Sequence, residues 1–293
     1  MVKRLLVSDE QLEELIHQYC NDFTAFSEQG RFDPIVGRDE EIDQTILILL
    51  QKGRKNVCYL APAGVGKTAL VVGLAQRVAS GKVPDYLKGA RVLEIDLASM
   101  AAGTDSPADF QARMIPLARG VAERYHEPEY PKYVMFIDEI HTIMPTCTGS
   151  GYRGLSEVMK PYLTVGDLHV LGATTIDEFK VHVAEDPALN RRFQKIHLRI
   201  PTPSETMVIL EALRGGLEKH HHVSIPDECL DLTVRLTQEH MRNRNQPDKS
   251  IISLDAACAY HVMTNGRGGE LTKDSVKYMI GKETNLNPRA FDD

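Results

Sequence analysis

Apolar residues recur at two spacings along this chain, and the change between them separates helical from strand-like regions. Near the start, leucine and isoleucine follow the spacing of one helical face after Ser8, which forms a capping-box pattern with Gln11. A second helix is predicted over about 39–52, with Gly53 as its stop. Both segments predict amphipathic helices that cover a core.

Short, continuous apolar runs then alternate with longer helical patterns. Runs of this length suit strands that are buried on both faces, and the alternation with helices predicts a parallel α/β sheet. The predicted strands are VCYL (57–60), RVLEID (91–96), YVMFID (133–138), HVLGA (169–173) and KIHLRI (195–200). We interpret IPTPSE (200–205) as a linker, because helical patterns alone follow it to about residue 281. They predict a small all-helical domain.

Composition narrows the classes of function. The 293 residues carry 34 basic and 41 acidic side chains, a net charge of -7, which argues against a general nucleic-acid-binding or polybasic membrane surface. No apolar run approaches the roughly 20 residues of a membrane span. The 5 cysteines are odd in number, widely spaced and without a CxxC pair. We therefore expect reduced thiols and a cytoplasmic protein.

The stretch APAGVGKTAL (61–70) carries the strongest chemical signal, because it follows a buried strand and opens a helix. Glycine in such a loop lets backbone N–H groups point at a phosphate, and the helix N-terminus adds partial positive charge. Lys67 can reach the β- and γ-phosphates, and the Thr68 hydroxyl can ligate Mg²⁺. Ala61 stands where the strict pattern has glycine, at the tolerant end of the strand. The predicted loop contacts are Ala61, Pro62, Ala63, Gly64, Val65, Gly66, Lys67, Thr68 and Ala69.

Polar residues that follow the later strands complete the candidate site. Asp138 and Glu139 end the strand at 133–138, where ligands of a parallel sheet bind. Asp138 is expected to support the metal, and Glu139 to orient the water that attacks the γ-phosphate. Thr175 follows the next strand and is either a γ-phosphate ligand or a helix cap. Arg191 and Arg192, in ALNRRFQKI (188–196), are expected to be surface charges when taken alone.

These motifs make the chain resemble the first nucleotide-binding module of the Clp-type AAA+ protein-remodelling ATPases, the ClpA and ClpB class. The similarity runs from about residue 15 to about residue 285, in the family order. It is carried by RFDPIVGRDEEID (31–43), GVGKTALVVGLAQRVASGKVPDYLKG (64–89), FIDEIHTI (136–143), LGATTIDEFK (171–180), EDPALNRRFQKI (185–196) and QPDKSI (246–251).

The resemblance implies an α/β AAA+ fold, in which a phosphate-loop parallel sheet flanked by helices precedes a small all-helical lid. It implies the ranges 1–30 for a helical lead-in, 31–201 for the nucleotide-binding domain, 202–285 for the lid and 286–293 for a tail. ATP and Mg²⁺ are the implied cofactors, and a homo-oligomeric ring, usually a hexamer, is the implied assembly.

The resemblance also gives roles that spacing alone does not. Thr175 matches the sensor of the γ-phosphate, and Arg191 with Arg192 matches the arginine fingers that reach the neighbouring subunit's nucleotide. The residues that match adenine and lid contacts are Ile35, Val36, Pro247 and Asp248.

One loop departs from the family. In the family, the channel loop carries a tyrosine with a basic neighbour, and the tyrosine grips a threaded polypeptide. In this chain the matching stretch is AGTDSPADFQ (102–111), with Ser106 at the position of the tyrosine and Asp105 at that of the basic residue. Ser106 suits a helix N-cap, with Pro107 at the first helical position. A substitute grip is conceivable at Tyr152-Arg153.

Two functions therefore stay open. The first is an Mg²⁺-dependent ATPase that remodels or translocates a protein partner. The second is a nucleotide-dependent assembly or scaffold subunit that threads nothing. A clamp-loader-like role on nucleic acid is disfavoured by the acidic balance, and no membrane insertion is expected.

Overall fold

The computed structural model describes residues 5–104, 106–147, 155–165 and 167–291. The chain divides into two compact units. The first consists of Met1–Phe32, Glu40–Ala61 and Lys67–Leu198, and the second of Asp33–Asp39, Pro62–Gly66 and Arg199–Asp293.

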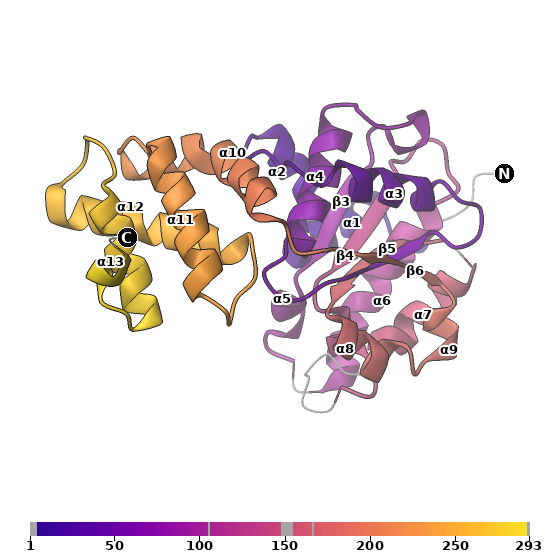
Figure 1. Cartoon of the computed structure of the whole chain (residues 1–293). Coiled ribbons are helices and arrows are strands. Elements are labelled where there is room, and N and C mark those ends of the chain that lie inside the picture. Colours follow the sequence, from indigo (N-terminus) through magenta and orange to yellow (C-terminus); the bar gives the residue numbers. More distant parts are fainter. Residues whose placement is uncertain (1–4, 105, 148–154, 166, 292–293) are drawn as a thin grey trace. The chain divides into compact units, whose positions relative to one another are not determined.

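The first unit is built on a mainly parallel sheet (Figure 1). Its spatial order is β1-β3-β4-β5-β2-β6, and only β1 runs antiparallel to its neighbour β3. The strands are β1 (Cys20–Asp22), β2 (Asn56–Leu60), β3 (Arg91–Ile95), β4 (Tyr133–Ile137), β5 (His169–Thr174) and β6 (Phe193–His197). Strands β2, β4 and β5 are buried along their whole length, as their apolar runs predicted.

Two strand predictions need correction. The last strand was expected over 195–200 but begins at Phe193 and ends at His197, because Phe193 is buried and pairs with Asn56 of β2. Ile200, which the prediction included, is 43% exposed. The strand β1 was not predicted, since its sequence CND is polar and only half-buried.

Helices surround this sheet. They are α1 (Asp9–Tyr19), α2 (Phe23–Glu28), α3 (Asp39–Leu49), α4 (Lys67–Ala79), α5 (Leu97–Ala101), α6 (Pro107–Arg124), α7 (Leu155–Val165), α8 (Ile176–Glu178) and α9 (Pro187–Asn190), with short turns η1 (Asp85–Leu87) and η2 (Ile140–Ile143) and a π-helical segment η3 (Phe179–Val183). The predicted capping box of Ser8 and Gln11 is present, and α3 ends three residues before the predicted Lys52.

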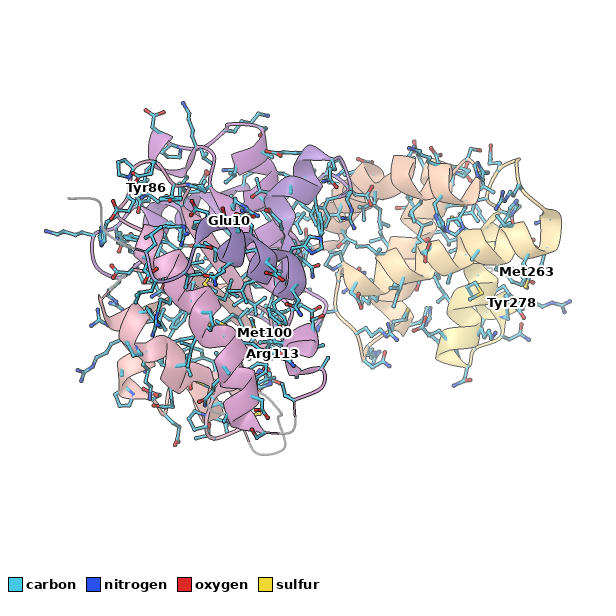
Figure 2. All side chains as sticks on the ribbon, turned by 180° about the vertical axis from the view of Figure 1, so that it is seen from behind. Glu10, Tyr86, Met100, Arg113, Met263 and Tyr278 are labelled. Carbon is cyan, nitrogen blue, oxygen red and sulfur yellow. The ribbon has the colours of Figure 1, made fainter. Side chains whose placement is uncertain are left out.

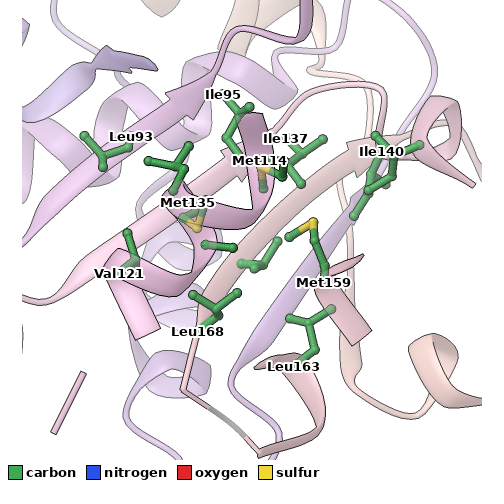
Figure 3. Packing of buried hydrophobic residues seen from close by; sticks show 14 of the residues in the cluster. Leu93, Ile95, Met114, Val121, Met135, Ile137, Ile140, Met159, Leu163 and Leu168 are labelled. Atoms are coloured by element: carbon green, nitrogen blue, oxygen red, sulfur yellow. The ribbon is translucent and has the colours of Figure 1, made fainter. Parts of the chain in front are cut away.

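The main core lies between β3, β4 and β5 and the helices α6 and α7. Met135 and Ile137 of β4 belong to the same buried cluster as Met114 of α6 and Leu163 of α7 (Figure 3). Burial of such side chains contributes about 1.5–3 kcal/mol each, which makes this cluster the main stabilising element of the unit.

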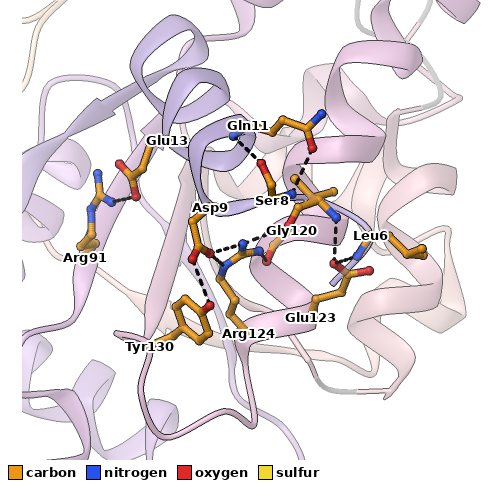
Figure 4. Close-up of polar contacts among 11 residues, drawn as sticks. Leu6, Ser8, Asp9, Gln11, Glu13, Arg91, Gly120, Glu123, Arg124 and Tyr130 are labelled. Atoms are coloured by element: carbon orange, nitrogen blue, oxygen red, sulfur yellow. Dashed lines mark hydrogen bonds and ion pairs between the residues drawn. The ribbon is translucent and has the colours of Figure 1, made fainter. Parts of the chain in front are cut away.

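A polar cluster fixes the N-terminal residues on α6 (Figure 4). Arg124 is only 1% exposed and donates hydrogen bonds to the Val7 and Gly120 carbonyl oxygens and to the Asp9 carboxylate. The Glu123 carboxylate accepts from the N–H groups of Leu6 and Val7. A buried guanidinium is tolerated here because each of these acceptors compensates for lost water.

The second unit contains α10 (Pro203–His221), α11 (Asp227–His240), α12 (Asp248–Asn265), α13 (Lys273–Thr284) and the turn η4 (Pro288–Phe291). Leu210, Leu230, Leu254 and Val276 form its separate core. The predicted linker 200–205 is wrong at its C-terminal half, because Thr202 and Glu205 form a capping box and Pro203 opens α10. Over the described residues, no helix has both the length and the apolar character of a membrane span.

A buried histidine predicts how acid affects the first unit. His169 is 0% exposed, its Nε2 lies 3.2 Å from the Tyr86 hydroxyl, and burial lowers its pKa to about 3. Between pH 7.5 and 5.5 the unfolded chain takes up a proton, with a pKa of about 6.5, that the folded chain does not. This should lower the free energy of unfolding by about 1.4 kcal/mol.

Urea unfolding at the two pH values measures this contribution. His169→Gln should remove it, whereas His17→Gln, which replaces an exposed histidine of the same unit, should keep it. Equal pH dependence in the two variants would contradict the assignment to His169.

Candidate functional site

The loop at 61–66 joins a buried strand directly to a helix, in the order predicted from the sequence. β2 ends at Leu60 and α4 begins at Lys67. Gly64 and Gly66 adopt left-handed backbone angles, with φ of 76° and 100°. Lys67 is 8% exposed, and its ammonium donates to the Ala61 carbonyl oxygen over 3.3 Å. A buried, positioned ammonium at a helix N-terminus is suited to bind a phosphate.

Two oxygen ligands of the kind that Mg²⁺ requires lie next to each other in the first unit. The Thr68 hydroxyl donates to the Asp138 carboxylate over 3.0 Å, joining the start of α4 to the end of β4. Hydroxyl and carboxylate oxygens are hard donors, so the pair fits a magnesium ion. The sequence prediction that paired these two residues is therefore compatible with their placement.

Glu139 directly follows Asp138 in a conformation that glutamate rarely adopts. Its φ and ψ are 48° and 50°, in the left-handed region, and its N–H donates to the Asp138 carboxylate over 2.9 Å. Burial raises the pKa of Glu139, and the nearby Lys67 ammonium opposes that rise. Strained backbone of this kind concentrates at functional sites, where the surrounding structure enforces it.

Thr175 is engaged at the N-terminus of α8. Its hydroxyl accepts from the Glu178 N–H over 3.2 Å and donates to the Glu178 carboxylate over 2.9 Å. The same carboxylate oxygen accepts from the Thr175 N–H and from the Thr174 hydroxyl. Burial opposes the effect, but these hydrogen bonds hold the pKa of Glu178 below its ordinary value. Glu178 therefore serves both threonines as a charged acceptor.

His141 connects this cap to Glu139. Its Nδ1 lies 2.9 Å from the Thr174 hydroxyl oxygen and 3.4 Å from carboxylate oxygens of both Glu139 and Glu178. Thr174 has one hydroxyl proton and donates it to Glu178, so His141 Nδ1–H must be the donor to Thr174. Sequence reasoning missed His141, Thr174 and Glu178, although T-x-x-E in TTIDE is a readable capping-box signal.

Donors in the second unit hold the carbonyl groups of Ala63, Gly64 and Val65. Arg38 donates to the Val65 oxygen over 2.8 Å, and the Asn245 amide donates to the Ala63 oxygen over 3.0 Å. The Asp248 N–H donates to the Gly64 oxygen over 3.4 Å. These donors fix the peptide groups that would meet a phosphate. Arg38 and Asn245 were not predicted from the sequence.

Other predicted nucleotide contacts belong to the same unit. Ile35 and Val36 are half-buried, and Pro247 is the N-cap residue of α12.

Gly64→Ala is expected to weaken nucleotide binding at least tenfold, because the site tolerates no side chain there. The left-handed backbone disfavours a Cβ, and a Cβ would lie 2.8 Å from the Asp248 Cβ. Gly37→Ala is the matched control, since Gly37 has a similar φ of 73° with nothing within 4 Å. Titration with a fluorescent ADP measures both affinities. Equal losses in the two variants would show that backbone angle alone matters.

Side chains of α6 hydrogen-bond to described residues that precede this helix. Ser106 forms a capping box with Asp109 and Pro107 opens the helix, so the predicted capping interpretation is confirmed. Arg113 donates to the carbonyl oxygens of Met100 and Ala102 over 2.7 Å each. Figure 2 labels Arg113 and Met100. Asp105 and the alternative grip Tyr152-Arg153 lie outside the described residues.

The two arginines lie at the end of α9. Arg191 is the exposed C-cap residue, and Arg192 is half-buried with its N–H bonded to the Leu189 oxygen. An exposed arginine at a helix end is accessible to a neighbouring molecule.

Comparisons with known proteins agree with these features. Residues 57–200 match the model of the ATPase family associated with various cellular activities (AAA), and residues 202–285 match the AAA lid domain. The chaperone protein ClpB of Vibrio cholerae is 38% identical over 250 residues, which are 85% of this chain and 29% of the relative. The chloroplastic chaperone protein ClpC3 of Oryza sativa subsp. japonica is 35% identical over 279 residues, 94% of this chain and 29% of the relative.

Solved structures give the same result. The Hsp104:casein complex of S. cerevisiae in an extended conformation matches with a TM-score of 0.80 and 34% identity, over 92% of this chain and 45% of that one. The chain thus spans about 29% of the length of the curated relatives it matches.

Proposed function

Since the chain belongs to the Clp-type AAA+ ATPases, we propose that it hydrolyses ATP and uses the hydrolysis to remodel a protein partner. The observation that carries the chemistry is the 3.0 Å contact between Thr68 and Asp138, with Glu139 next in the chain.

The proposed chemistry follows from the placement of these side chains. The Lys67 ammonium and the N–H groups of the loop bind the β- and γ-phosphates. Thr68 and Asp138 would hold Mg²⁺, which would offset the negative charge of the phosphates. The Glu139 carboxylate accepts a hydrogen bond from the attacking water and orients it toward the γ-phosphate. The Thr175 hydroxyl forms a hydrogen bond with the γ-phosphate.

Assembly completes the site in this proposal. Arg191 and Arg192 act on the nucleotide of an adjacent subunit, where a guanidinium stabilises charge that develops during transfer. Hydrolysis then depends on a homo-oligomeric ring, which we propose is a hexamer. Ile35, Val36, Pro247 and Asp248 contact the base in the same scheme.

A protein partner is supported by the relatives. The ClpB and ClpC3 relatives are named chaperones, and casein is part of the Hsp104 structure. The loop at 102–111 favours the second candidate, a nucleotide-dependent scaffold that threads nothing. Ser106 is used as a cap and Phe110 is only 2% exposed, so neither offers an apolar grip.

Two measurements on the full chain test the proposal. Light scattering with and without ATPγS, alongside a phosphate-release assay, should show a nucleotide-dependent oligomer that hydrolyses ATP. ATP-driven unfolding of a tagged fluorescent reporter would then exclude the scaffold-only function. Hydrolysis without unfolding over several reporters would favour it, and no hydrolysis in the assembled state would overturn the proposal.

A further inference from the structure

The hydroxyl proton of Thr175 is already in use. The hydroxyl has one proton, and it is donated to the Glu178 carboxylate over 2.9 Å. A hydroxyl in this state offers only lone pairs to other groups, and a phosphate oxygen also offers only lone pairs. To donate to a phosphate, Thr175 must therefore withdraw its proton from Glu178.

Glu178 has other partners that would keep it in place after such a withdrawal. The same carboxylate oxygen accepts from the Thr175 N–H over 3.1 Å and from the Thr174 hydroxyl over 3.0 Å. Thr174 is fully buried and is itself held by His141 over 2.9 Å. Losing the Thr175 hydroxyl costs Glu178 one hydrogen bond of three, so the exchange is a local one.

We propose that Glu178 competes with the terminal phosphate of ATP for the Thr175 hydroxyl and thereby lowers the preference of the site for ATP over ADP. This inference rests on the proposed role of Thr175 at the γ-phosphate. ADP has no γ-phosphate, so its binding leaves the Thr175–Glu178 bond intact. Glu178 is thus a specificity-determining residue that acts through Thr175.

Thr175 and Arg191 lie on one continuous stretch of the chain. Thr175 caps α8, which continues into the π-helical segment η3 and then α9, and Arg191 caps the end of α9. Single π-helical turns occur frequently at functional sites.

Glu178→Gln tests the competition, because glutamine also completes a capping box but is a weaker, uncharged acceptor. Affinities of the full chain for ADP and ATPγS would be measured by displacement of a fluorescent ADP. We expect the dissociation constant of ADP divided by that of ATPγS to rise about tenfold in this variant, because the competitor for the Thr175 hydroxyl is weakened. A residue that only caps the helix would leave this ratio unchanged.

Two further variants make the test specific. Asp177→Asn removes a neighbouring exposed charge from the same short helix and should leave the ratio unchanged. In a Thr175→Val background, Glu178→Gln should no longer shift it. An unchanged ratio in Glu178→Gln, or a full shift in the Thr175→Val background, overturns the inference. If the wild-type chain bound neither nucleotide, the proposed function itself would fail instead.

Discussion

Glu139→Gln is expected to reduce ATP hydrolysis by about a hundredfold or more while ATP still binds. Glutamine has nearly the shape of glutamate, so the contacts of Lys67, Thr68 and Asp138 with the phosphates and metal should persist. It cannot accept the proton of the attacking water as a carboxylate does. Phosphate release under saturating ATP measures the rate, and displacement of a fluorescent nucleotide measures the binding.

The backbone at Glu139 supplies an internal control for folding. Its φ of 48° lies in the left-handed region, which costs a residue with a Cβ about 1–2 kcal/mol, whereas glycine adopts it freely. The free energy of unfolding of Glu139→Gly should therefore lie within about 1 kcal/mol of the wild-type value, because the relief of backbone strain offsets the greater entropy of glycine in the unfolded chain. It should nevertheless hydrolyse ATP no faster than Glu139→Gln. Wild-type rates in either variant would show that Glu139 is not the group that activates water.

The apolar pattern of the sequence predicted the fully buried strands and also β3, whereas it missed β1 and misplaced β6. β2, β4 and β5 are buried on both faces, so their apolar runs are continuous and short. β1 consists of three half-buried residues, and its pairing with β3 leaves no apolar signal. Pro203 was included in the predicted linker, although Thr202 and Glu205 form a T-x-x-E capping pattern with proline at the first helical position, which the sequence already contains.

The residues of the candidate site also fall into those that the sequence predicted and those that it missed. Lys67, Thr68, Asp138 and Glu139 belong to contiguous motifs whose spacing already implies their chemistry. His141 contacts Thr174 because β4 and β5 are neighbours in the sheet, and the spacing of residues along the chain does not predict this contact. Gly172 permits that approach, since a Cβ there would lie 2.5 Å from Ile140 Cδ1 of η2.

Arg191→Ala is expected to lower ATP hydrolysis about a thousandfold without loss of nucleotide binding, because the guanidinium would act on a neighbour's nucleotide during transfer. The exposed position of Arg191 at the end of α9 agrees with a role outside its own subunit. Arg192→Ala should have the same kind of effect, whereas Lys180→Ala, which removes an exposed cation from the same segment, should not. Phosphate release measured above the concentration needed for assembly gives these rates.

Mixing two inactive variants separates action on a neighbour from action within one subunit. Arg191→Ala subunits keep an intact Glu139, and Glu139→Gln subunits keep an intact Arg191. At equal amounts, random assembly gives about a quarter of the interfaces both intact groups, so the mixture should regain hydrolysis well above the sum of the separate rates. A mixture that shows only that sum, although light scattering demonstrates mixed assemblies, would mean that Arg191 serves its own subunit. Trans action predicts the gain because each complete site draws its carboxylate from one chain and its guanidinium from the next.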